Sequence, residues 1–196
     1  MAVLPEEAKD LIFRTARTRN GWSDAPVTDA DIQAIYDLAK WGPTSANGSP
    51  ARFVWVKSQE GRETLAACAS GTNAAKILAA PVTVLIGRDL SFHDKLDYLF
   101  PQGPYMKTLM EGSPEIARAT AVRNTTLQGA YLIIAARSLG FDCGPMSGFD
   151  ADKVNQAFFA GTTVEVDFIC SIGKGTDAGL FDRLPRLPFE DANRIV

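Results

Sequence analysis

The spacing of apolar residues predicts two helices near the start of the chain. Apolar and small side chains recur at helical spacing through residues 4–18, and the Asn-Gly pair at 20–21 predicts the end of that helix. Thr28 is typical of an N-cap, with Asp31 three residues later in the position of a capping box. An apolar stripe follows, and the Gly-Pro pair at 42–43 predicts where the second helix stops.

Three segments read as β-strands. Continuous β-prone runs at 53–56 and 82–86 predict strands that are covered on both faces, because such strands lack a polar side. The segments 60–69 and 73–80 are typical of short helices. Residues 164–172 alternate, which predicts a strand with two different faces. The side chains expected together on one of those faces are Val164, Val166, Phe168, Cys170 and Ile172.

The longest helical pattern runs from 113 to 139. Its stretch 130–136 is apolar almost all round, which predicts burial on most sides, and Gly140 is the expected end of the helix. After a loop at 144–149, residues 150–159 predict another short helix. Several helices around a few strands indicate an α+β fold.

Two segments fit no regular pattern. Residues 88–112 mix aromatic side chains with Pro and Gly, and we expect an irregular stretch in which 92–112 is either a lid or a packed excursion. Residues 180–196 carry prolines and arginines with little core of their own, which predicts a C-terminal arm. No linker-like run divides the chain, so residues 1–196 are expected to form a single domain.

Composition narrows the function more than the fold. The chain has 20 Lys+Arg against 23 Asp+Glu, a net charge of −3, which disfavours a nucleic-acid-binding protein. No run approaches the roughly 20 apolar residues of a membrane span, and the acidic N-terminus does not resemble a signal peptide. Three widely spaced cysteines indicate neither a disulfide framework nor a zinc site, so we expect buried thiols and a reducing, cytoplasmic setting.

The common catalytic motifs are missing. The sequence has no Gly-rich dinucleotide fingerprint, Walker loop, zinc-protease motif or nucleophile elbow. The single histidine, His93, excludes a site with two histidine ligands and is expected at the surface. Chemistry would therefore have to come from a bound cofactor or from scattered residues.

Several short stretches combine glycine with small polar or basic side chains. Taken alone, each stretch is more typical of an ordinary helix cap, a turn or a solvated tail than of a binding site. Together they suit a flat, anionic cofactor, because arginine binds phosphate bidentately and glycine lets backbone N–H groups approach a ring closely. The stretches are residues 17–20, residues 43–50, Asn73 with Lys76, residues 144–149, and Arg183 with Arg186.

The order of these stretches resembles the nitroreductase-like family of FMN oxidoreductases over nearly the whole chain. The matching segments are 16–18 with 20–22, 41–47, 49–53, 80–83, 144–150 and 183–187. The resemblance implies a nitroreductase fold with a central mixed sheet flanked by helices. It also implies a homodimer with exchanged terminal arms, and one FMN at each of two interface sites.

The resemblance also assigns roles to residues. It implies contacts to the FMN phosphate and ribityl chain from Arg17, Thr18, Arg19, Asn20, Arg183 and Arg186. It places beneath the ring a loop containing Pro43, Thr44, Ser45 and Asn47. It places at the ring edge Asn73, Lys76, Pro145, Met146, Ser147 and Gly148. A cation at that edge suits the negative charge that reduction puts on the ring. Many relatives carry Glu where this chain has Ser147, and a main-chain contact survives that change.

The implied activity is two-electron transfer in two half-reactions, with NADPH or NADH as the reductant. Segments 49–53 and 144–150 are most similar to the malonic semialdehyde reductases of pyrimidine (uracil) catabolism. A carboxylate-bearing substrate would need a cation, for which composition offers Arg52, Lys107 and Arg123, and Tyr105 is a candidate proton donor.

Three other interpretations remain open. The first is a broad-specificity nitro/quinone reductase with the same cofactor, in which the aromatic residues of 92–105 stack on planar substrates. The second is a scaffold that has lost turnover. The third is an interaction protein built around the long apolar helix.

Overall fold

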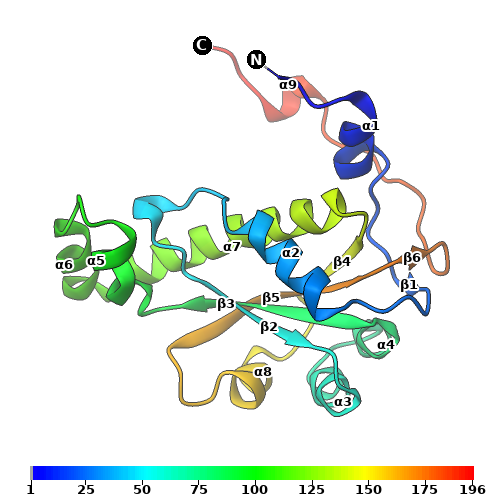
Figure 1. Cartoon of the computed structure of the whole chain (residues 1–196), viewed down its shortest axis with the longest axis horizontal. Helices are drawn as coiled ribbons and strands as arrows, with labels where there is room; N and C mark the ends of the chain where they lie inside the picture. Colours follow the sequence, from blue (N-terminus) through cyan, green and yellow to red (C-terminus); the bar gives the residue numbers. More distant parts are fainter. Residues whose placement is uncertain (1) are drawn as a thin grey trace.

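A four-stranded sheet organises the chain, and the computed structural model describes residues 2–196 of it (Figure 1). Every strand pair in this sheet is antiparallel, and the strand order is β2-β3-β5-β4. The strands are β2 (Ala51–Val56), β3 (Val82–Asp89), β4 (Asp142–Met146) and β5 (Val164–Gly173). The expected mixed sheet is thus wrong for the hydrogen-bonded strands of one chain, where the parallel contact is the single bridge between Thr18 and Cys143.

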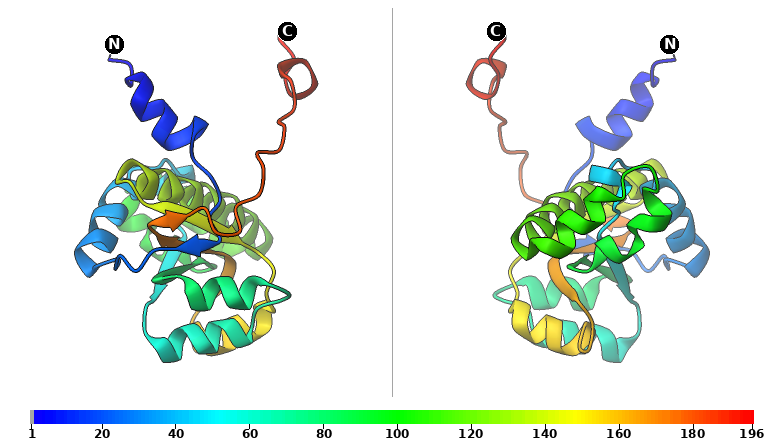
Figure 2. Two further views of the ribbon diagram at one scale, coloured as in Figure 1. Left: turned by 90° about the vertical axis from the view of Figure 1, so that its right-hand side faces the viewer. Right: turned by 90° about the vertical axis from the view of Figure 1, so that its left-hand side faces the viewer.

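Helices cover both faces of the sheet (Figures 1 and 2). One face carries α2 (Asp29–Ala39) and the 25-residue α7 (Pro114–Ser138). The opposite face carries α3 (Gln59–Ala67), α4 (Asn73–Ala79) and α8 (Ala151–Phe158). The capping box predicted for the second helix is present, with the Thr28 side chain accepting from the Asp31 amide.

Each side of the sheet has its own apolar core. Along β2, Phe53 and Trp55 pack toward α2 and α7, whereas Val54 and Val56 pack toward α3 and α8. The middle of β3 is fully buried on both sides. The two continuous apolar runs therefore form strands covered on both faces, as their sequence predicted.

The predicted alternation of β5 is wrong in its first half. Phe168, Cys170 and Ile172 share one core, but Val164 and Val166 belong to the opposite one. The pairing with β3 shifts at this point, because Ile86 opposes Phe168 while the next residue, Gly87, opposes Val166. Asp167 is the extra residue of a β-bulge, and a one-residue insertion exchanges the faces of a strand.

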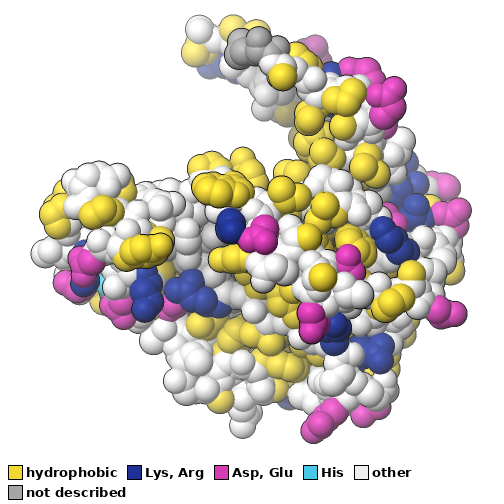
Figure 3. Space-filling model, in the orientation of Figure 1, with side chains coloured by type: hydrophobic (Ala, Val, Ile, Leu, Met, Phe, Trp, Pro, Cys, Tyr) yellow, Lys and Arg dark blue, Asp and Glu magenta, His cyan; other side chains and the backbone are white. Residues whose placement is uncertain are grey.

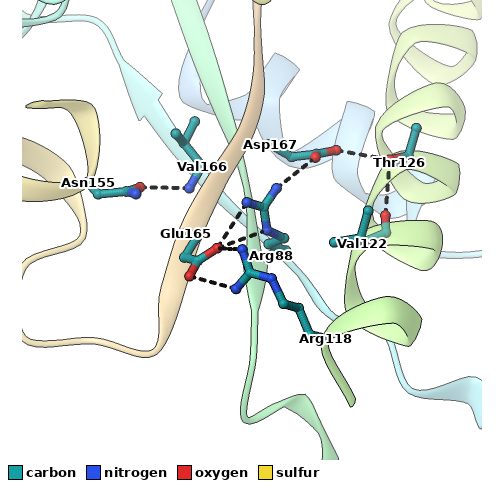
Figure 4. A network of polar contacts seen from close by, with 8 residues as sticks. All are labelled: Arg88, Arg118, Val122, Thr126, Asn155, Glu165, Val166 and Asp167. Carbon is teal, nitrogen blue, oxygen red and sulfur yellow. Dashed lines mark hydrogen bonds and ion pairs between the residues drawn. The ribbon is translucent and has the colours of Figure 1, made fainter. Parts of the chain in front are cut away.

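An ion network holds this bulge against α7 (Figure 4). Arg88 donates to Asp167 at 3.0 Å and to Glu165 at 2.9 Å. Arg118 of α7 donates to both oxygens of Glu165, at 2.9 and 2.8 Å, and Thr126 donates to Asp167 at 3.0 Å. The hydrogen bonds from Arg118, and to a smaller extent those from Arg88, lower the pKa of Glu165 below its ordinary value, although partial burial acts in the opposite direction. The network joins the start of α7 to the sheet.

The substitution Glu165→Gln should lower the free energy of unfolding at pH 7 by about 1–2 kcal/mol, because it removes charge-assisted bonds that are partly exposed. The depressed pKa stabilises the folded protein above the unfolded pKa of about 4.3, and this contribution is lost as pH falls through the folded pKa. Urea unfolding of both proteins should therefore show the difference narrowing below pH 4. Glu7→Gln, an exposed site without an ion pair among residues 2–196, is the control. If the difference in free energy of unfolding between the Glu165→Gln variant and the unmodified protein is the same at every pH, the ionic explanation is contradicted.

Residues 92–112 are packed and mainly helical, so the expectation of an irregular stretch is wrong. They form η3 (Phe92–Lys95), α5 (Leu96–Leu99) and α6 (Tyr105–Gly112). Phe92 and Met110 are buried against Ala117 and Ala121 of α7. Of the two alternatives for this segment, the packed excursion is the one observed.

Local boundaries differ elsewhere too. The first helix is shorter than 4–18, because α1 (Glu6–Lys9) continues only as the π turn η1 (Asp10–Arg14). Three strands lie where no strand was predicted: β4, and the two-residue pair β1 (Gly21–Trp22) and β6 (Gly175–Thr176). The remaining elements are η2 (Ser45–Asn47) and α9 (Phe189–Ala192).

Both termini leave the body of the protein (Figures 1 and 2). Large apolar side chains on them remain exposed, among them Phe13, Phe181, Leu184 and Leu187. More apolar side chains gather along the adjacent upper edge of the body (Figure 3). Within residues 2–196, no helix is both long and apolar enough to cross a membrane.

Candidate functional site

The largest described cleft, of about 350 Å³, lies between the N-terminal segment, the end of α7 and the start of the C-terminal arm. Six residues singled out from the sequence line it together: Arg17, Thr18, Asn20, Lys76, Arg183 and Arg186. Residues more than 160 positions apart in the chain thus share one wall. Arg137, which the sequence analysis missed, lines the same cleft.

A backbone contact fixes the N-terminal side of this cleft. The Arg19 amide donates to the Cys143 carbonyl at 3.1 Å, next to the Thr18–Cys143 bridge. A Cβ on Gly144 would lie only 2.6 Å from the Arg19 carbonyl oxygen. Glycine at 144 is therefore what lets residues 18–20 lie against β4.

Side chains then tie the N-terminal segment to the C-terminal arm. Arg17 donates to the Phe181 carbonyl, and Arg183 donates to the Ala16 carbonyl at 3.0 Å. Asn20 donates to the Gly179 carbonyl at 2.9 Å. These bonds bring the arginines of both segments to one place.

The cleft is strongly cationic. Four arginines and Lys76 line it, whereas Asp182 is its one acidic lining residue among residues 2–196. This is a local excess of positive charge in a chain whose net charge is −3. Like charges in one cleft repel, and an anion held between them relieves that repulsion. Guanidinium groups match a phosphate or carboxylate in particular.

A second group of predicted residues lies beside the cleft. Asn73 donates to the Gly148 carbonyl at 3.1 Å, and Lys76 follows one helical turn later on α4. A Cβ on Gly148 would lie 2.6 Å from the Asn73 amide nitrogen, so this corner needs glycine. Pro145 and Met146 share with Lys76 a small adjoining cavity of about 30 Å³. Ser147 is exposed next to Gly148.

Arg19 does not line the large cleft. Its guanidinium forms ion pairs with Asp177 at 2.5 Å and Asp142 at 3.5 Å, and donates to the Thr176 carbonyl at 3.1 Å. The hydrogen bond to Asp177 is the main cause that raises the pKa of Arg19, and the nearby Asp142 adds to it, although burial acts in the opposite direction. Arg19 thus anchors the β1–β6 pair and lines the small adjoining cavity rather than the large cleft, and its contact to the cofactor stays a prediction.

The loop at 43–47, predicted to lie beneath the ring, is distant from the cationic cleft within one chain. The Ser45 amide donates to Asn124 in the middle of α7 at 2.8 Å, and Asn47 donates to the Leu99 carbonyl at 2.9 Å. Asn124 and Arg137 are thirteen residues apart on one helix, which is about 20 Å at 1.5 Å per residue. Within one chain, the structure does not bring Pro43, Thr44, Ser45 and Asn47 to the cationic cleft.

This loop has an unusual backbone. Ala46, Asn47 and Ser49 have φ angles of 52°, 50° and 41°, in the left-handed region that favours glycine. The Thr44 hydroxyl accepts from the Ser49 amide at 3.1 Å, and Asn124 holds Ser45. Strained backbone that is fixed by its surroundings is concentrated at functional sites, so the loop is a candidate second half of the site.

The substitution Ala46→Gly should raise the free energy of unfolding by about 0.5–1 kcal/mol, because glycine adopts the left-handed conformation without a Cβ clash. The same change at Ala34, an exposed position inside α2, should lower it by about 1 kcal/mol. Urea unfolding of the two variants beside the unmodified protein makes the comparison. Destabilisation by both substitutions to the same extent means that Ala46 is not strained.

The proposed substrate residues lie outside the cleft. Arg52 pairs with Asp89 at 2.6 Å and lines a separate groove of about 280 Å³, and Lys107 pairs with Asp97. Tyr105 on α6 and Arg123 on α7 are exposed. The structure does not gather these four residues in one chain.

No described thiol or histidine is placed as a nucleophile or base in the cleft. His93 is largely buried, with 14% of its side chain exposed, which corrects the expectation of a surface histidine. The three cysteines are buried and free, as expected. Burial raises the pKa of Cys68, and a hydrogen bond with Cys143 together with burial raises that of Cys170. Thiols in such surroundings are unreactive.

The sequence and the α+β fold of this chain are similar to those of known proteins. The sequence profile of the Nitroreductase family matches residues 14–174, so the chain belongs to the nitroreductase family. A protein of Stenotrophomonas maltophilia (strain R551-3), named "Putative NADH dehydrogenase/NAD(P)H nitroreductase", is 56% identical over 193 residues, 98% of each chain. A protein of the same name from Caulobacter sp. (strain K31) is 54% identical over 196 residues, 100% of each.

Solved structures show the same fold at low sequence identity. A "putative nitroreductase in complex with FMN" from Exiguobacterium sibiricum 255-15 superposes with a TM-score of 0.87 at 20% identity, covering 100% of this chain and 99% of that one. A nitroreductase-family structure from Bacillus subtilis gives a TM-score of 0.85 at 20% identity, covering 97% and 99%. The expected nitroreductase fold is therefore confirmed.

Proposed function

We propose that this protein is an FMN-dependent NAD(P)H oxidoreductase that reduces nitro compounds and quinones. The single observation that carries the proposal is the cleft whose described lining brings together Arg17, Arg137, Arg183, Arg186 and Lys76 and includes no cysteine or histidine. Relatives over 50% identical are named for NAD(P)H nitroreductase activity, and a structure of the same fold is described in complex with FMN.

The residues of the cleft fit a flavin nucleotide. The arginines suit a phosphate dianion, and the small residues Thr18 and Asn20 suit a polyol chain. Asn73 packs closely on Gly148 beside the cleft, and this corner is proposed to contact the edge of the flat ring. When bound, FMN supplies the two-electron chemistry, accepting a reducing equivalent from NAD(P)H and passing it to the oxidised substrate.

The residues of the chain would bind the cofactor, orient it and adjust the charge around its ring. Lys76 stands at the junction of the large cleft and the small cavity, where a fixed cation stabilises negative charge that develops on a ring. Asn73 is held by the Gly148 carbonyl, so its side chain is positioned before any ligand arrives. A site with these tasks needs neither a catalytic histidine nor a reactive thiol.

The site requires a second copy of the chain. The strained loop 43–47 is held at Asn124, about 20 Å along α7 from Arg137, and its residues do not line the cleft within one chain. The terminal segments expose Phe13, Phe181 and Leu184, and the upper edge of the body is apolar as well (Figure 3). Burying these apolar surfaces against a partner removes them from water, which is favourable. We therefore propose a homodimer in which the loop of one protomer completes the cleft of the other.

Nitro compounds and quinones are proposed ahead of malonic semialdehyde because relatives over 50% identical are named NAD(P)H nitroreductases. Of the three cations predicted to hold a carboxylate-bearing substrate, Arg52 is bonded to Asp89 and Lys107 to Asp97, which leaves the exposed Arg123. Exposed aromatic rings on the packed 92–112 segment, Tyr98 and Tyr105, suit planar substrates instead.

The purified protein should show an oxidised-flavin absorbance spectrum that bleaches anaerobically on addition of NADPH or NADH. Turnover should then be faster with a quinone or nitroaromatic acceptor than with malonic semialdehyde, because two of the three cations predicted to hold the carboxylate, Arg52 and Lys107, are engaged in ion pairs. Competing the two substrate classes in one assay measures the preference directly. A clear preference for the semialdehyde overturns the substrate assignment, and a protein that neither contains nor takes up FMN overturns the enzyme assignment.

The double substitution Arg17→Ala with Arg186→Ala should lower FMN affinity by two or more orders of magnitude. Each arginine contributes charge-assisted bonds of roughly 1.5–3 kcal/mol to a phosphate, and 1.4 kcal/mol is a factor of ten in affinity. Quenching of FMN fluorescence on titration gives the dissociation constant. Substituting Lys57 and Lys40, two lysines outside the cleft, with Ala removes the same charge as a control. Unchanged affinity in the Arg17/Arg186 variant means that the phosphate lies elsewhere.

A further inference from the structure

We infer that Arg137 is a phosphate-binding residue of the cationic cleft. The end of helix α7 would then supply the cleft with a cation whose position is fixed. The inference rests on the proposed function, because the phosphate in question is that of FMN. Neither the motifs nor the matching loops point to this residue, which lies inside a long helix.

The position of Arg137 is set by the helix that carries it. It lies in the last turn of α7, one residue before the helix ends at Ser138. The side chain is half-buried and lines the cleft. A helix C-terminus carries partial negative charge, which favours a cation there and offsets part of the cost of burying it.

The guanidinium of Arg137 keeps most of its hydrogen-bonding capacity. Of its five N–H donors, one has an acceptor among residues 2–196, the Ile12 carbonyl at 3.2 Å. Its Nε is buried without a hydrogen-bond partner, and no described carboxylate forms an ion pair with the group. Among the other half-buried arginines, Arg19, Arg52 and Arg88 are paired with carboxylates. Arg62 has no ion pair among residues 2–196 but donates to three uncharged acceptors, the carbonyls of Leu78 and Ala80 and the side chain of Gln59. With one acceptor and no described carboxylate, Arg137 keeps its charge and most of its donors available to an anion in the cleft.

The remaining arginines of the cleft are held less firmly. Arg183 and Arg186 lie on the exposed arm, and Arg186 donates only to carbonyls of its own turn. Arg17 precedes β1 on the N-terminal segment and is held by the arm through the Phe181 carbonyl. The backbone of Arg137 belongs to the 25-residue helix that packs on the sheet, so its position is set by the body of the protein and not by the arms. A donor fixed in advance loses less freedom on binding a ligand and is worth more affinity.

The test compares FMN with riboflavin, which has the same ring and polyol but no phosphate. The substitution Arg137→Gln should weaken FMN binding by about 10- to 100-fold, measured by fluorescence quenching, and leave riboflavin affinity unchanged. Lys57→Gln, which removes one positive charge from an exposed ion pair outside the cleft, should change neither. Raising the salt concentration should weaken FMN binding less in the Arg137 variant than in the unmodified protein.

Three results overturn the inference, and they are distinguishable. Equal losses for FMN and riboflavin mean that Arg137 acts only on structure, through its bond to Ile12. FMN binding that is unchanged in the variant, while the unmodified protein prefers FMN to riboflavin, contradicts the role of Arg137 and leaves the proposed function standing. An unmodified protein that binds neither flavin overturns both.

Discussion

Helix α7 is the constraint on which the rest of the structure depends. Its 25 residues span about 37 Å, and it packs on α2, α6 and the sheet along that length. It carries Asn124, which holds the strained loop, and Arg137, which lines the cationic cleft. The ion network of Arg118, Glu165 and Arg88 joins its first half to the β5 bulge. A rigid helix therefore both builds the two halves of the site and keeps them apart within one chain.

The separation of the cleft from the loop 43–47 within one chain is the reason for proposing a site that is shared between two protomers. A cleft of cations and a loop of small polar residues would make a complete flavin site only if both reached one ring. Within one chain the loop does not line the cleft, and in the proposed dimer a second copy supplies it. The exposed apolar arms beside the cleft are consistent with the same arrangement, since they have little core of their own.

The charge of the site is organised in two different ways. Half-buried arginines that serve the fold, such as Arg88 and Arg19, are matched by carboxylates. The arginines of the cleft are bonded to backbone carbonyls or retain free donors, which leaves their charge available to a ligand. Two neighbouring residues, Thr18 and Arg19, illustrate the division, because the first lines the cleft and the second anchors the β1–β6 pair.

The sequence by itself determined the long helix, the two buried strands, the capping box at Thr28 and six residues of the cleft. Those features depend on local periodicity and on residue types whose chemistry is specific. The tertiary structure decided the rest. It alone placed the bulge at Asp167 that exchanges the faces of β5, the ion pairs that engage Arg19 and Arg52, and the packing of residues 92–112. It alone brought Arg137 to the cleft. Each of these depends on partners distant in the chain, which a local pattern of apolar and polar positions does not encode.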